Sequence, residues 1–243
     1  MDKKEPHSYI FIALVAVLVV LSLVFILMPQ KQSEAWQQSE ASKKATTTKV
    51  ENIPLVAFIG DSICAGADDD LKVEQRWPQM VSQQLKWFAY DACIGGSGYI
   101  NPGPDGKSTY KQVSDGLFPK FNPAFIVIEG GQNDVASITA DMATEMSAAA
   151  CDLYASIRKN YPKVKLIVMT PFYGVNQAPP VVGVQESAIK ECAAKYKAKV
   201  IPNVRKWLQD QPDLFIADLT NPNGKGHELI ARKFVAWFKA NKF

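Results

Sequence analysis

Histidine is scarce in this chain, and clusters of basic residues are absent. Only two histidines, His7 and His227, occur among the 243 residues, and no cysteine or histidine spacing is typical of a zinc site. The 27 Lys and Arg residues are scattered without interleaved aromatic residues, so a formal net charge of +3 gives no support for nucleic-acid binding. We therefore expect no metal, no cofactor and no nucleic-acid partner.

The composition gives no indication of a disordered or fibrous protein. Hydrophobic residues make up 47% of the chain and charged residues 21%, which are the proportions of an ordinary globular protein. The length suits one sizeable α/β domain with an appendage.

A long apolar run stands near the start of the chain. Residues 9–28 contain no charged residue and are about long enough to cross a bilayer as a helix. A cleaved signal peptide is the alternative, with Ser33-Glu34-Ala35 as its small-x-small site. Secretory apolar regions are usually only about 7–15 residues long, so the run favours an uncleaved, single-pass signal anchor in the cell membrane, after a short tail at 1–8.

The orientation of this anchor is predicted from charge and from the length of the tail. Lys3 and Lys4 precede the run, whereas Lys31, Lys43 and Lys44 come after it, so the positive-inside rule is nearly balanced. A first anchor helix with a very short amino-terminal tail commonly exports the chain on its carboxyl-terminal side. We therefore expect an extracellular carboxyl-terminal domain.

Residues 29–52 predict a flexible linker, and residues 53–243 a single folded domain. The linker is rich in Gln, Ser, Lys, Thr and Ala and has no apolar period. In the domain, apolar runs and helical patterns alternate. The expected strands are Leu55–Ile59, Ala89–Ile94, Ala124–Glu129, Val164–Thr170 and Lys199–Ile201, and the expected helices are Pro78–Phe88, Ser137–Asn160, Val184–Lys197 and Gly224–Lys242. This order predicts a flavodoxin-like three-layer α/β/α sandwich with a five-stranded parallel sheet, preceded by one transmembrane helix.

Three short motifs come after the first three expected strands. Gly60-Asp61-Ser62-Ile63 places a serine at the carboxyl end of a strand, where open α/β sheets hold their ligands. The stretch 91–99 contains Gly96 and Gly98, whose N–H groups can point at a ligand without a Cβ in the way. Gly131-x-Asn133-Asp134 stands at the end of the third strand. Taken singly, the glycines also suit ordinary turns, and Asn133 also suits the cap of the next helix.

Together these motifs resemble the first three blocks of the SGNH, or GDSL, family of esterases and lipases, and the resemblance covers about residues 54–240. It implies that Ser62 is the nucleophile. It also implies an oxyanion hole formed by the N–H of Ser62, the N–H of Gly96, with Gly98 as competitor, and the side chain of Asn133. Related membrane-anchored members suggest the same extracellular side for the domain.

The last block of the family departs from its pattern here. The family has Asp-x-x-His-Pro-Asn-x-x-Gly, and the chain matches it at Asp218, Pro222, Asn223 and Gly226, but Asn221 stands at the position of the catalytic histidine. A serine hydroxyl needs a neighbouring base to take its proton, and an asparagine amide does not titrate near neutral pH.

Two other residues are candidates for the base. His227 is the single candidate on the outer face to replace the missing imidazole, since His7 precedes the expected membrane span. The alternative is that His227 packs or caps near the start of the last helix. Asp218 acting directly on Ser62 is disfavoured, because an exposed carboxylate is a weak base toward an alcohol.

The resemblance implies an ester hydrolase that acts through an acyl-Ser62. Its substrate would be a small-molecule ester or an acylated glycan, that is, an acyl or acetyl ester of a carbohydrate or lipid. The alternative is a pseudoenzyme that binds a cell-wall glycan or acyl ligand without turnover. Acyl transfer to a sugar hydroxyl is a third possibility and needs the same serine chemistry.

Cysteines and loops complete the predictions. Cys64 and Cys93 would lie close together if the first two strands are neighbours. Cys151 and Cys192 would lie close together if the helices that contain them are neighbours. The four cysteines could form two disulfides or could be four buried thiols. The loops 99–110 and 172–182 come after strands and mix aromatic, Pro and Gly residues. Tyr99 and Tyr173 are the candidates to stack on a sugar, with ordinary loop packing as the alternative.

Overall fold

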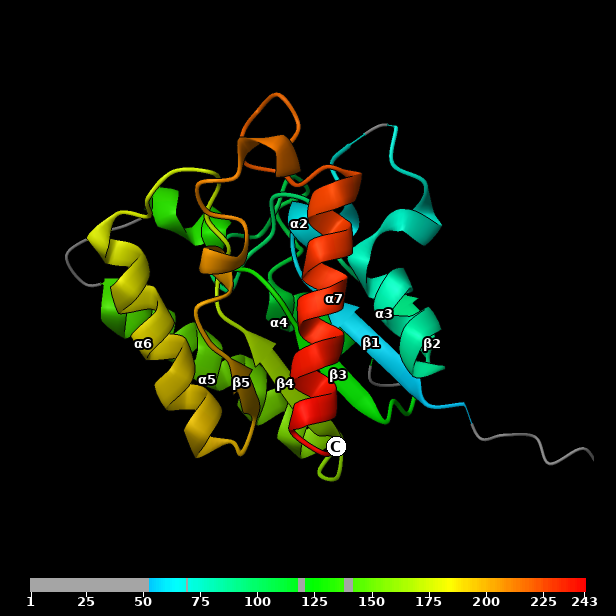
Figure 1. Ribbon diagram of the computed structural model, residues 1–243. Coiled ribbons are helices and arrows are strands. Elements are labelled where there is room, and N and C mark those ends of the chain that lie inside the picture. The colour runs from blue at the N-terminus through cyan, green and yellow to red at the C-terminus, as the bar shows by residue number, and fades with distance from the viewer. Residues whose placement is uncertain (1–52, 69, 118–120, 138–141) are drawn as a thin grey trace, which may run out of the picture. The chain divides into compact units, whose positions relative to one another are not determined.

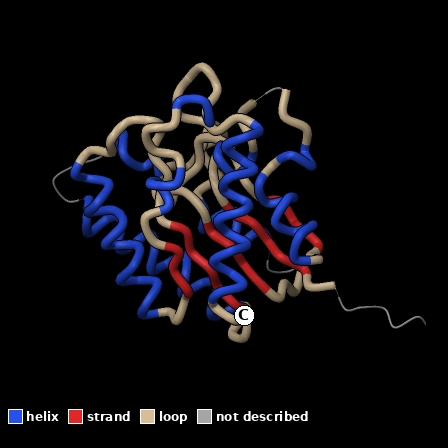
Figure 2. Tube along the Cα trace, in the orientation of Figure 1, coloured by secondary structure: helices blue, strands red, loops and turns tan. Residues whose placement is uncertain are grey.

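A five-stranded parallel sheet forms the centre of the domain (Figures 1 and 2). The computed structural model describes residues 53–68, 70–117, 121–137 and 142–243. The strands are β1 (Leu55–Ile59), β2 (Phe88–Asp91), β3 (Phe125–Ile128), β4 (Lys165–Met169) and β5 (Lys199–Ile201). They are hydrogen-bonded in the order β2-β1-β3-β4-β5, which confirms the parallel sheet expected from the alternation of strands and helices.

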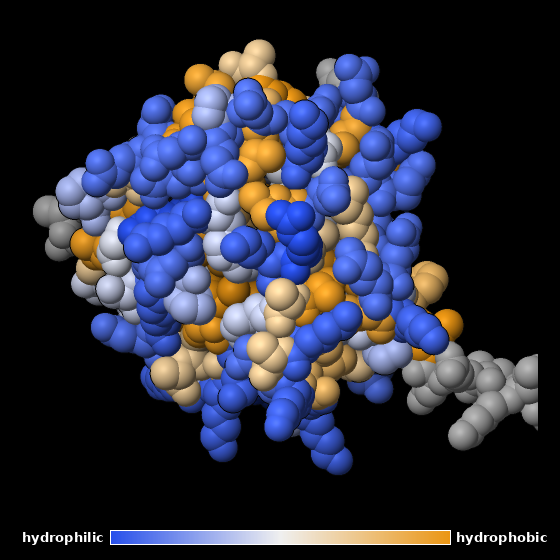
Figure 3. All heavy atoms as spheres, viewed as in Figure 1, coloured by the Kyte–Doolittle hydropathy of each residue, from blue (hydrophilic) through white to orange (hydrophobic). Residues whose placement is uncertain are grey.

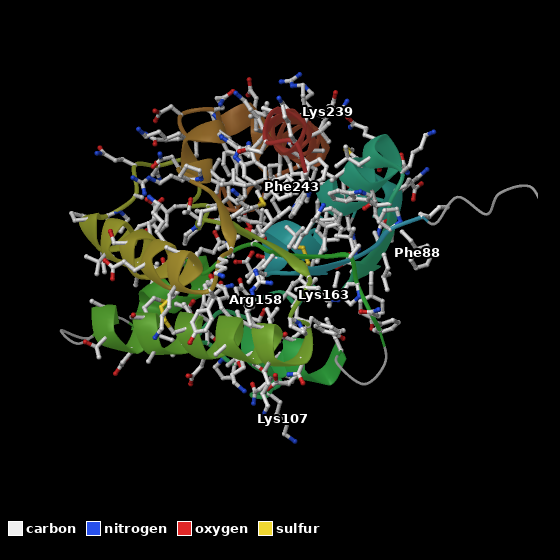
Figure 4. The ribbon with its side chains drawn as sticks, turned by 90° about the horizontal axis from the view of Figure 1, so that it is seen from below. Phe88, Lys107, Arg158, Lys163, Lys239 and Phe243 are labelled. Carbon is white, nitrogen blue, oxygen red and sulfur yellow. A yellow bond between two sulfur atoms is a disulfide. The ribbon has the colours of Figure 1, made fainter. Side chains whose placement is uncertain are left out.

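Helices cover both faces of the sheet. They are α2 (Ser62–Ala65), α3 (Trp77–Leu85), α4 (Tyr110–Leu117), α5 (Met142–Asn160), α6 (Pro180–Lys195) and α7 (Gly224–Ala240), with the 3₁₀ helices η1 (Val73–Gln75), η2 (Gln132–Ser137), η3 (Val204–Trp207) and η4 (Pro212–Leu214). Seen from below in Figure 4, α5 and α6 lie on one side of the sheet, and α3 and α7 on the other. This is the expected three-layer arrangement.

The strand sequences explain why both faces need cover. Side chains alternate between the faces of a strand, and nearly every position of β1 and β3 is buried. Ala57 and Ile59 join one apolar cluster with residues of α5 and α6. Val56 and Phe58 join the other, with Trp77 of α3 and with residues of α7. Burial of both clusters is the main force that holds the three layers together.

Two disulfides cross-link the domain. Cys64 of α2 pairs with Cys93, which comes after β2, and Cys151 of α5 pairs with Cys192 of α6. These are the two pairs that neighbouring strands and helices would allow.

The expectations differ from the structure at several element boundaries. The second strand ends at Asp91 rather than Ile94, where the Asp91 carboxylate accepts the N–H of Cys93 and the chain turns. Helix α4 falls partly in the loop predicted at 99–110, and the loop predicted at 172–182 ends in the first turn of α6. Helix α5 begins at Met142.

The predicted tail, membrane helix and linker at 1–52 lie outside the described residues. Among the helices that the structure describes, none combines the length and apolar character needed to cross a membrane. Polar side chains cover most of the face seen in Figure 3, with small hydrophobic areas between them.

Candidate active site

Ser62 stands at the first position of α2, directly after the carboxyl end of β1. Asp61 caps this helix, because its Oδ1 accepts the N–H of Ile63 at 3.0 Å. The N–H of Ser62 donates no hydrogen bond within the described part of the chain. Its hydroxyl likewise has no hydrogen bond among the described residues. Ser62 therefore offers a free N–H and a free hydroxyl at the edge of the sheet.

The turn before Ser62 requires glycine. A Cβ built on Gly60 would lie 2.7 Å from the Cβ of Cys64 and 2.8 Å from Oε2 of Glu129. These distances are shorter than real Cβ contacts allow, so any larger residue would push α2 away from the end of β3. The Gly-Asp-Ser motif is thus a packing requirement as well as the site of a serine.

The glycine turn after β2 lies beside this serine. The N–H of Ile94 donates to the carbonyl of Gly60 at 2.9 Å, and the N–H of Ser97 donates back to the carbonyl of Ile94 at 3.1 Å. Gly96 sits in this turn with a φ of 80°, which favours glycine. A Cβ built on Gly95 would be 3.8 Å from the Cβ of Ser62, so the turn and the serine are in contact distance.

The hydrogen bonds separate the two candidate oxyanion donors. The N–H of Gly98 donates to the carbonyl of Asn101 at 2.9 Å. The N–H of Gly96 makes no hydrogen bond within the residues that the structure describes. Of the two candidates, Gly96 therefore keeps a free donor of the kind that an oxyanion hole needs, and its role stays a prediction.

Asn133 is held against the same turn. Its Nδ2 donates to the carbonyl of Ser97 at 2.8 Å, which leaves the second hydrogen of the amide without a bond in the described part of the chain. It lies in η2, whereas the next α-helix starts only at Met142. The alternative role of Asn133 as a cap for that helix is not what the structure shows.

Asp134 fixes the loop that contains Gly98, a role that the motif alone did not indicate. Its two carboxylate oxygens accept the N–H groups of Tyr99, Ile100 and Asn101 at 2.8–3.0 Å. A Cβ on Gly98 would clash with Oδ1 of Asp134. Burial raises the pKa of Asp134, although these three hydrogen bonds act in the opposite direction.

A second buried acidic group lies beneath the nucleophile turn. Asp61 and Glu129 are both fully buried. Burial raises the pKa of Asp61 to about 7, although hydrogen bonds from the N–H of Ile63 and the hydroxyl of Tyr110 work against this. Burial and the neighbouring Asp61 raise the pKa of Glu129 well above its usual range. Neither carboxyl forms a salt bridge among the described residues.

Asn221 and Asp218 are joined in the loop before α7. Nδ2 of Asn221 donates to Oδ2 of Asp218 at 2.6 Å, while the N–H groups of Asn221 and Thr220 donate to Oδ1 at 2.8 Å. Partial burial alone would raise the pKa of Asp218, but these hydrogen bonds outweigh it and hold the pKa below its usual range. Asp218 is therefore a carboxylate at neutral pH, and its partner is an amide.

His227 does not serve Ser62 in this structure. It is fully buried at the start of α7, and its Nδ1 accepts the backbone N–H of Trp77 at 3.2 Å. Burial and the positive charge of Arg76 lower its pKa to about 4, so the ring is neutral at pH 7 with its proton on Nε2. Because its one acceptor nitrogen is occupied, the geometry gives no support to His227 as a substitute base.

A cleft of about 370 Å³ opens beside these residues. Its lining comprises Gln132, Asn133, Tyr173, Gly174, Asn176, Asp218, Leu219 and Thr220. Tyr173 therefore lies in the cleft, and its contact with a sugar stays a prediction. Tyr99 does not lie in the cleft, because it is 3% exposed and its hydroxyl shares a hydrogen bond of 2.8 Å with Tyr154 in the core. The prediction that Tyr99 contacts a substrate was wrong.

Comparisons with known proteins find related sequences and similar folds. The chain is 28% identical to the GDSL lipase Rv0518 of Mycobacterium tuberculosis over 185 residues, which cover 73% of this chain and 78% of that protein. Its fold is similar to that of the psychrotrophic esterase EstA from Pseudoalteromonas sp., with a TM-score of 0.63 and 17% identity over 77% of this chain and 97% of EstA. It also resembles a family two carbohydrate esterase from Clostridium thermocellum, with a TM-score of 0.62 and 22% identity over 78% of this chain and 64% of the esterase.

The match to a family model is the strongest of these findings. Residues 58–229 match the model of the GDSL-like Lipase/Acylhydrolase family. This range begins in β1, contains Ser62 and Asn133, and extends past Asp218 into α7. The chain belongs to the GDSL-like lipase and acylhydrolase family.

Proposed function

We propose that this protein hydrolyses an ester through an acyl intermediate on Ser62, at a rate limited by the lack of a triad histidine. The observation that carries the proposal is a set of three unpaired hydrogen-bond donors, at Ser62, at the turn beside it and at Asn133. The N–H of Ser62, the N–H of Gly96 and one hydrogen of Asn133 Nδ2 have no other acceptor in the described chain. Hydrogen bonds from Ile94 to Gly60 and from Asn133 to Ser97 hold the three donors together.

The chemistry is determined by these groups. Oγ of Ser62 attacks the ester carbonyl carbon, its proton passes to water, and the three donors stabilise the negative charge that develops on the carbonyl oxygen. The alcohol then leaves, and water releases the acid from the acyl-serine. Removing a catalytic base costs several orders of magnitude, but an oxyanion hole with substrate binding retains about 10³–10⁴-fold acceleration over water.

The test is hydrolysis of p-nitrophenyl acetate by the purified full chain beside Ser62→Ala and His227→Gln. We expect slow turnover by the wild type, loss of that turnover in Ser62→Ala, and retention in His227→Gln. Mass spectrometry should find an added acetyl group on Ser62. Equal rates for wild type and Ser62→Ala would contradict catalysis by Ser62.

A second function is favoured by the bond between Asn221 and Asp218. The Asn221 amide donates a hydrogen bond to the Asp218 carboxylate, as a triad histidine would, but the amide cannot accept a proton from Ser62. A domain with this pair could bind an acyl or glycan ligand in the cleft without turnover. Ligand binding by a wild type that hydrolyses no faster than Ser62→Ala would establish this second function. Acyl transfer to a sugar hydroxyl would require the same acyl-Ser62, and it would appear as acylated sugar when a sugar is added to the p-nitrophenyl acetate reaction.

We further propose that the domain is held outside the cell by an anchor at residues 9–28. Two observations support this placement, the uncharged apolar run and the pairing of all four cysteines in disulfides, which persist in oxidising environments. Protease treatment of intact cells should remove the domain, while a cytoplasmic control protein survives. Protection of the domain would contradict the extracellular location.

A further inference from the structure

The cleft beside the candidate active site has a lining that disfavours two common classes of ester. Among the described residues that line it, Asp218 is the only charged side chain, and no Lys or Arg is present to neutralise a phosphate. Asp218 also carries its full negative charge at neutral pH, because its pKa is lowered. Anionic phospholipid headgroups and other polyanions would meet repulsion there.

Long acyl chains are disfavoured as well. A site for such a chain needs a lining that is mostly apolar, since burying unpaired amides against hydrocarbon costs free energy. Here the side chains of Gln132, Asn133 and Asn176 are amides, and Thr220 adds a hydroxyl. Only Tyr173 and Leu219 contribute large apolar surfaces.

The amides instead suit neutral hydroxyl groups. An amide presents an acceptor and two donors side by side, which matches neighbouring hydroxyls of a sugar ring. Asn176 is exposed and its side chain has no hydrogen bond among the described residues. Its donors and acceptor are thus free for a ligand.

Leu219 is unusual in both conformation and exposure. Its φ is 55°, a left-handed conformation that is strained for leucine, and its side chain is 44% exposed. The loop is fixed in this form, because the carbonyl of Leu219 accepts the N–H of Val175 at 2.9 Å and a Cβ on Gly174 would lie 2.9 Å from the same oxygen. Folding alone gives no reason for a leucine here, since asparagine or glycine would fit the backbone better.

An apolar contact with a ligand would account for this residue. Leu219 and Tyr173 come from different loops and both line the cleft, which contains Asn133 and Asp218 of the candidate active site. The segment between η4 and α7 that carries Leu219 projects at the top of Figure 1, beyond the carboxyl ends of the strands. A ligand that offers hydroxyls to the amides and a C–H face to these two side chains is a carbohydrate.

We propose that this cleft binds a neutral carbohydrate chain, with Leu219 and Tyr173 contacting the C–H faces of its rings and Asn176 bonding its hydroxyls. The proposal rests on the proposed function in one respect: the carbohydrate would carry the acyl ester that Ser62 attacks. Leu219 thereby acts as a specificity-determining residue whose strain is maintained for binding and not for stability.

The experiment measures binding by isothermal titration with the full chain carrying Ser62→Ala, so that hydrolysis plays no part. The probes are cellotetraose, an N-acetylglucosamine tetramer, inorganic phosphate, and vesicles of phosphatidylglycerol. We expect at least one of the two neutral oligosaccharides to bind and neither phosphate nor the vesicles to bind. Absence of binding by both oligosaccharides, or stronger binding by phosphate or vesicles, would overturn the proposal.

Variants in the same background test the role of Leu219. Leu219→Asn should weaken oligosaccharide binding about fivefold, and Tyr173→Ala about tenfold, because both remove apolar contact area. Leu219→Asn should at the same time unfold at the same or a higher temperature, since asparagine tolerates the left-handed conformation. Unchanged affinity in Leu219→Asn would overturn its assigned role.

Lys197→Asn is the matched control. Lys197 has a φ of 53° and is exposed after the end of α6, and it does not line the cleft. This variant should likewise keep or gain stability, and it should leave the affinity for the oligosaccharides unchanged.

The two proposals can fail separately. If the wild type hydrolyses the activated ester but Ser62→Ala binds neither oligosaccharide, the carbohydrate proposal fails while the proposed hydrolysis stands. If Ser62→Ala binds an oligosaccharide but the wild type does not hydrolyse the activated ester, the proposed hydrolysis fails while the carbohydrate proposal stands.

Discussion

Asn221 donates a hydrogen bond of 2.6 Å from Nδ2 to Oδ2 of Asp218, the bond that a triad imidazole would make from its Nδ1. In the proposed mechanism Asn221 stands at the position of the triad histidine, so the Asp218 carboxylate is available to orient an imidazole introduced there. We expect Asn221→His to raise kcat/KM for p-nitrophenyl acetate by about 10²-fold or more, because a base can then take the proton of Ser62. The gain should depend on a titration near pH 6–7, as expected for an imidazole paired with a carboxylate.

The control for this gain is the double variant Ser62→Ala/Asn221→His. It should show no increase, because the new base has no hydroxyl to activate. A gain that survives the loss of Ser62 would mean that the introduced imidazole hydrolyses the ester by itself. If Asn221→His folds but its kcat/KM does not rise, position 221 is not the place of a missing triad histidine.

His227 should affect stability rather than activity. The pKa of His227 is about 4 in the folded chain and 6.5 in the unfolded chain. Between pH 4 and pH 6.5 the imidazole is therefore protonated in the unfolded chain and neutral in the folded chain. Stability linked to His227 is thus fully present above about pH 6.5 and is lost as pH falls toward 4. Relative to His227→Gln, the wild type should lose about 2 kcal/mol of unfolding free energy between pH 7.5 and pH 5.

Urea unfolding of both proteins at the two pH values measures this difference. Glutamine keeps an acceptor for the N–H of Trp77 but does not titrate, so any constant offset between the proteins cancels. A difference that does not change with pH would mean that the imidazole is not held neutral in the folded state.

Much of the fold could be predicted because the strands are apolar runs bounded by turn residues. Leu55–Ile59 and Lys199–Ile201 were predicted with their observed bounds. The motif residues at the strand ends are predicted by the same reasoning, since a parallel sheet brings those ends to one edge. Helix α4 was missed although Tyr110, Val113 and Leu117 have helical spacing, because the segment is only 8 residues long and contains a glycine.

The side-chain environments could not be predicted in the same way. His227 contacts Trp77 across 150 positions of sequence, and nothing local indicates whether its ring faces Trp77 or Ser62. Tyr99 directly follows Gly98 in a glycine-rich stretch, which is typical of a loop residue, but the carboxylate of Asp134 accepts its N–H and its ring packs in the core. Long-range contacts of this kind decide the chemistry of the site, and the pattern of apolar residues does not encode them.

The buried carboxyl of Asp61 should have an effect on stability opposite in sign to that of His227. Its pKa rises from 3.8 to about 7 on folding, so the folded state favours the protonated form. Its contribution is fully present below about pH 4 and is lost as pH rises through 7. Asp61→Asn retains a cap for Ile63 without titrating, so between pH 4 and 8 the wild type should lose stability relative to this variant, on the order of a few kcal/mol.

Thermal unfolding of both proteins across this range tests the prediction. Glu129 lies next to Asp61, and its pKa is also raised. Like Asp61→Asn, the variant Glu129→Gln should therefore lose less stability than the wild type as the pH rises. A wild type whose stability relative to Asp61→Asn grows with rising pH would show that Asp61 is ionised in the folded protein.

The two disulfides should contribute similarly to stability but differently to catalysis. Their cysteines are 29 and 41 residues apart, and closing loops of these lengths stabilises a fold by about 3–4 kcal/mol each. Cys64–Cys93 links the helix that begins with Ser62 to the turn that carries Gly96, whereas Cys151–Cys192 links α5 to α6. Loss of the first should therefore shift the nucleophile relative to an oxyanion donor, and a misplacement near 1 Å can cost about 10²-fold in rate.

The test compares Cys64→Ala/Cys93→Ala with Cys151→Ala/Cys192→Ala, both in the Asn221→His background. At a temperature where both variants are folded, the first should lose at least about tenfold in kcat/KM and the second should lose little. Because the two variants lose similar stability, a general loosening of the domain would lower both rates equally. Equal rates would show that hydrogen bonds such as Ile94 to Gly60 suffice to place Gly96 beside Ser62, and that the Cys64–Cys93 bond serves stability alone.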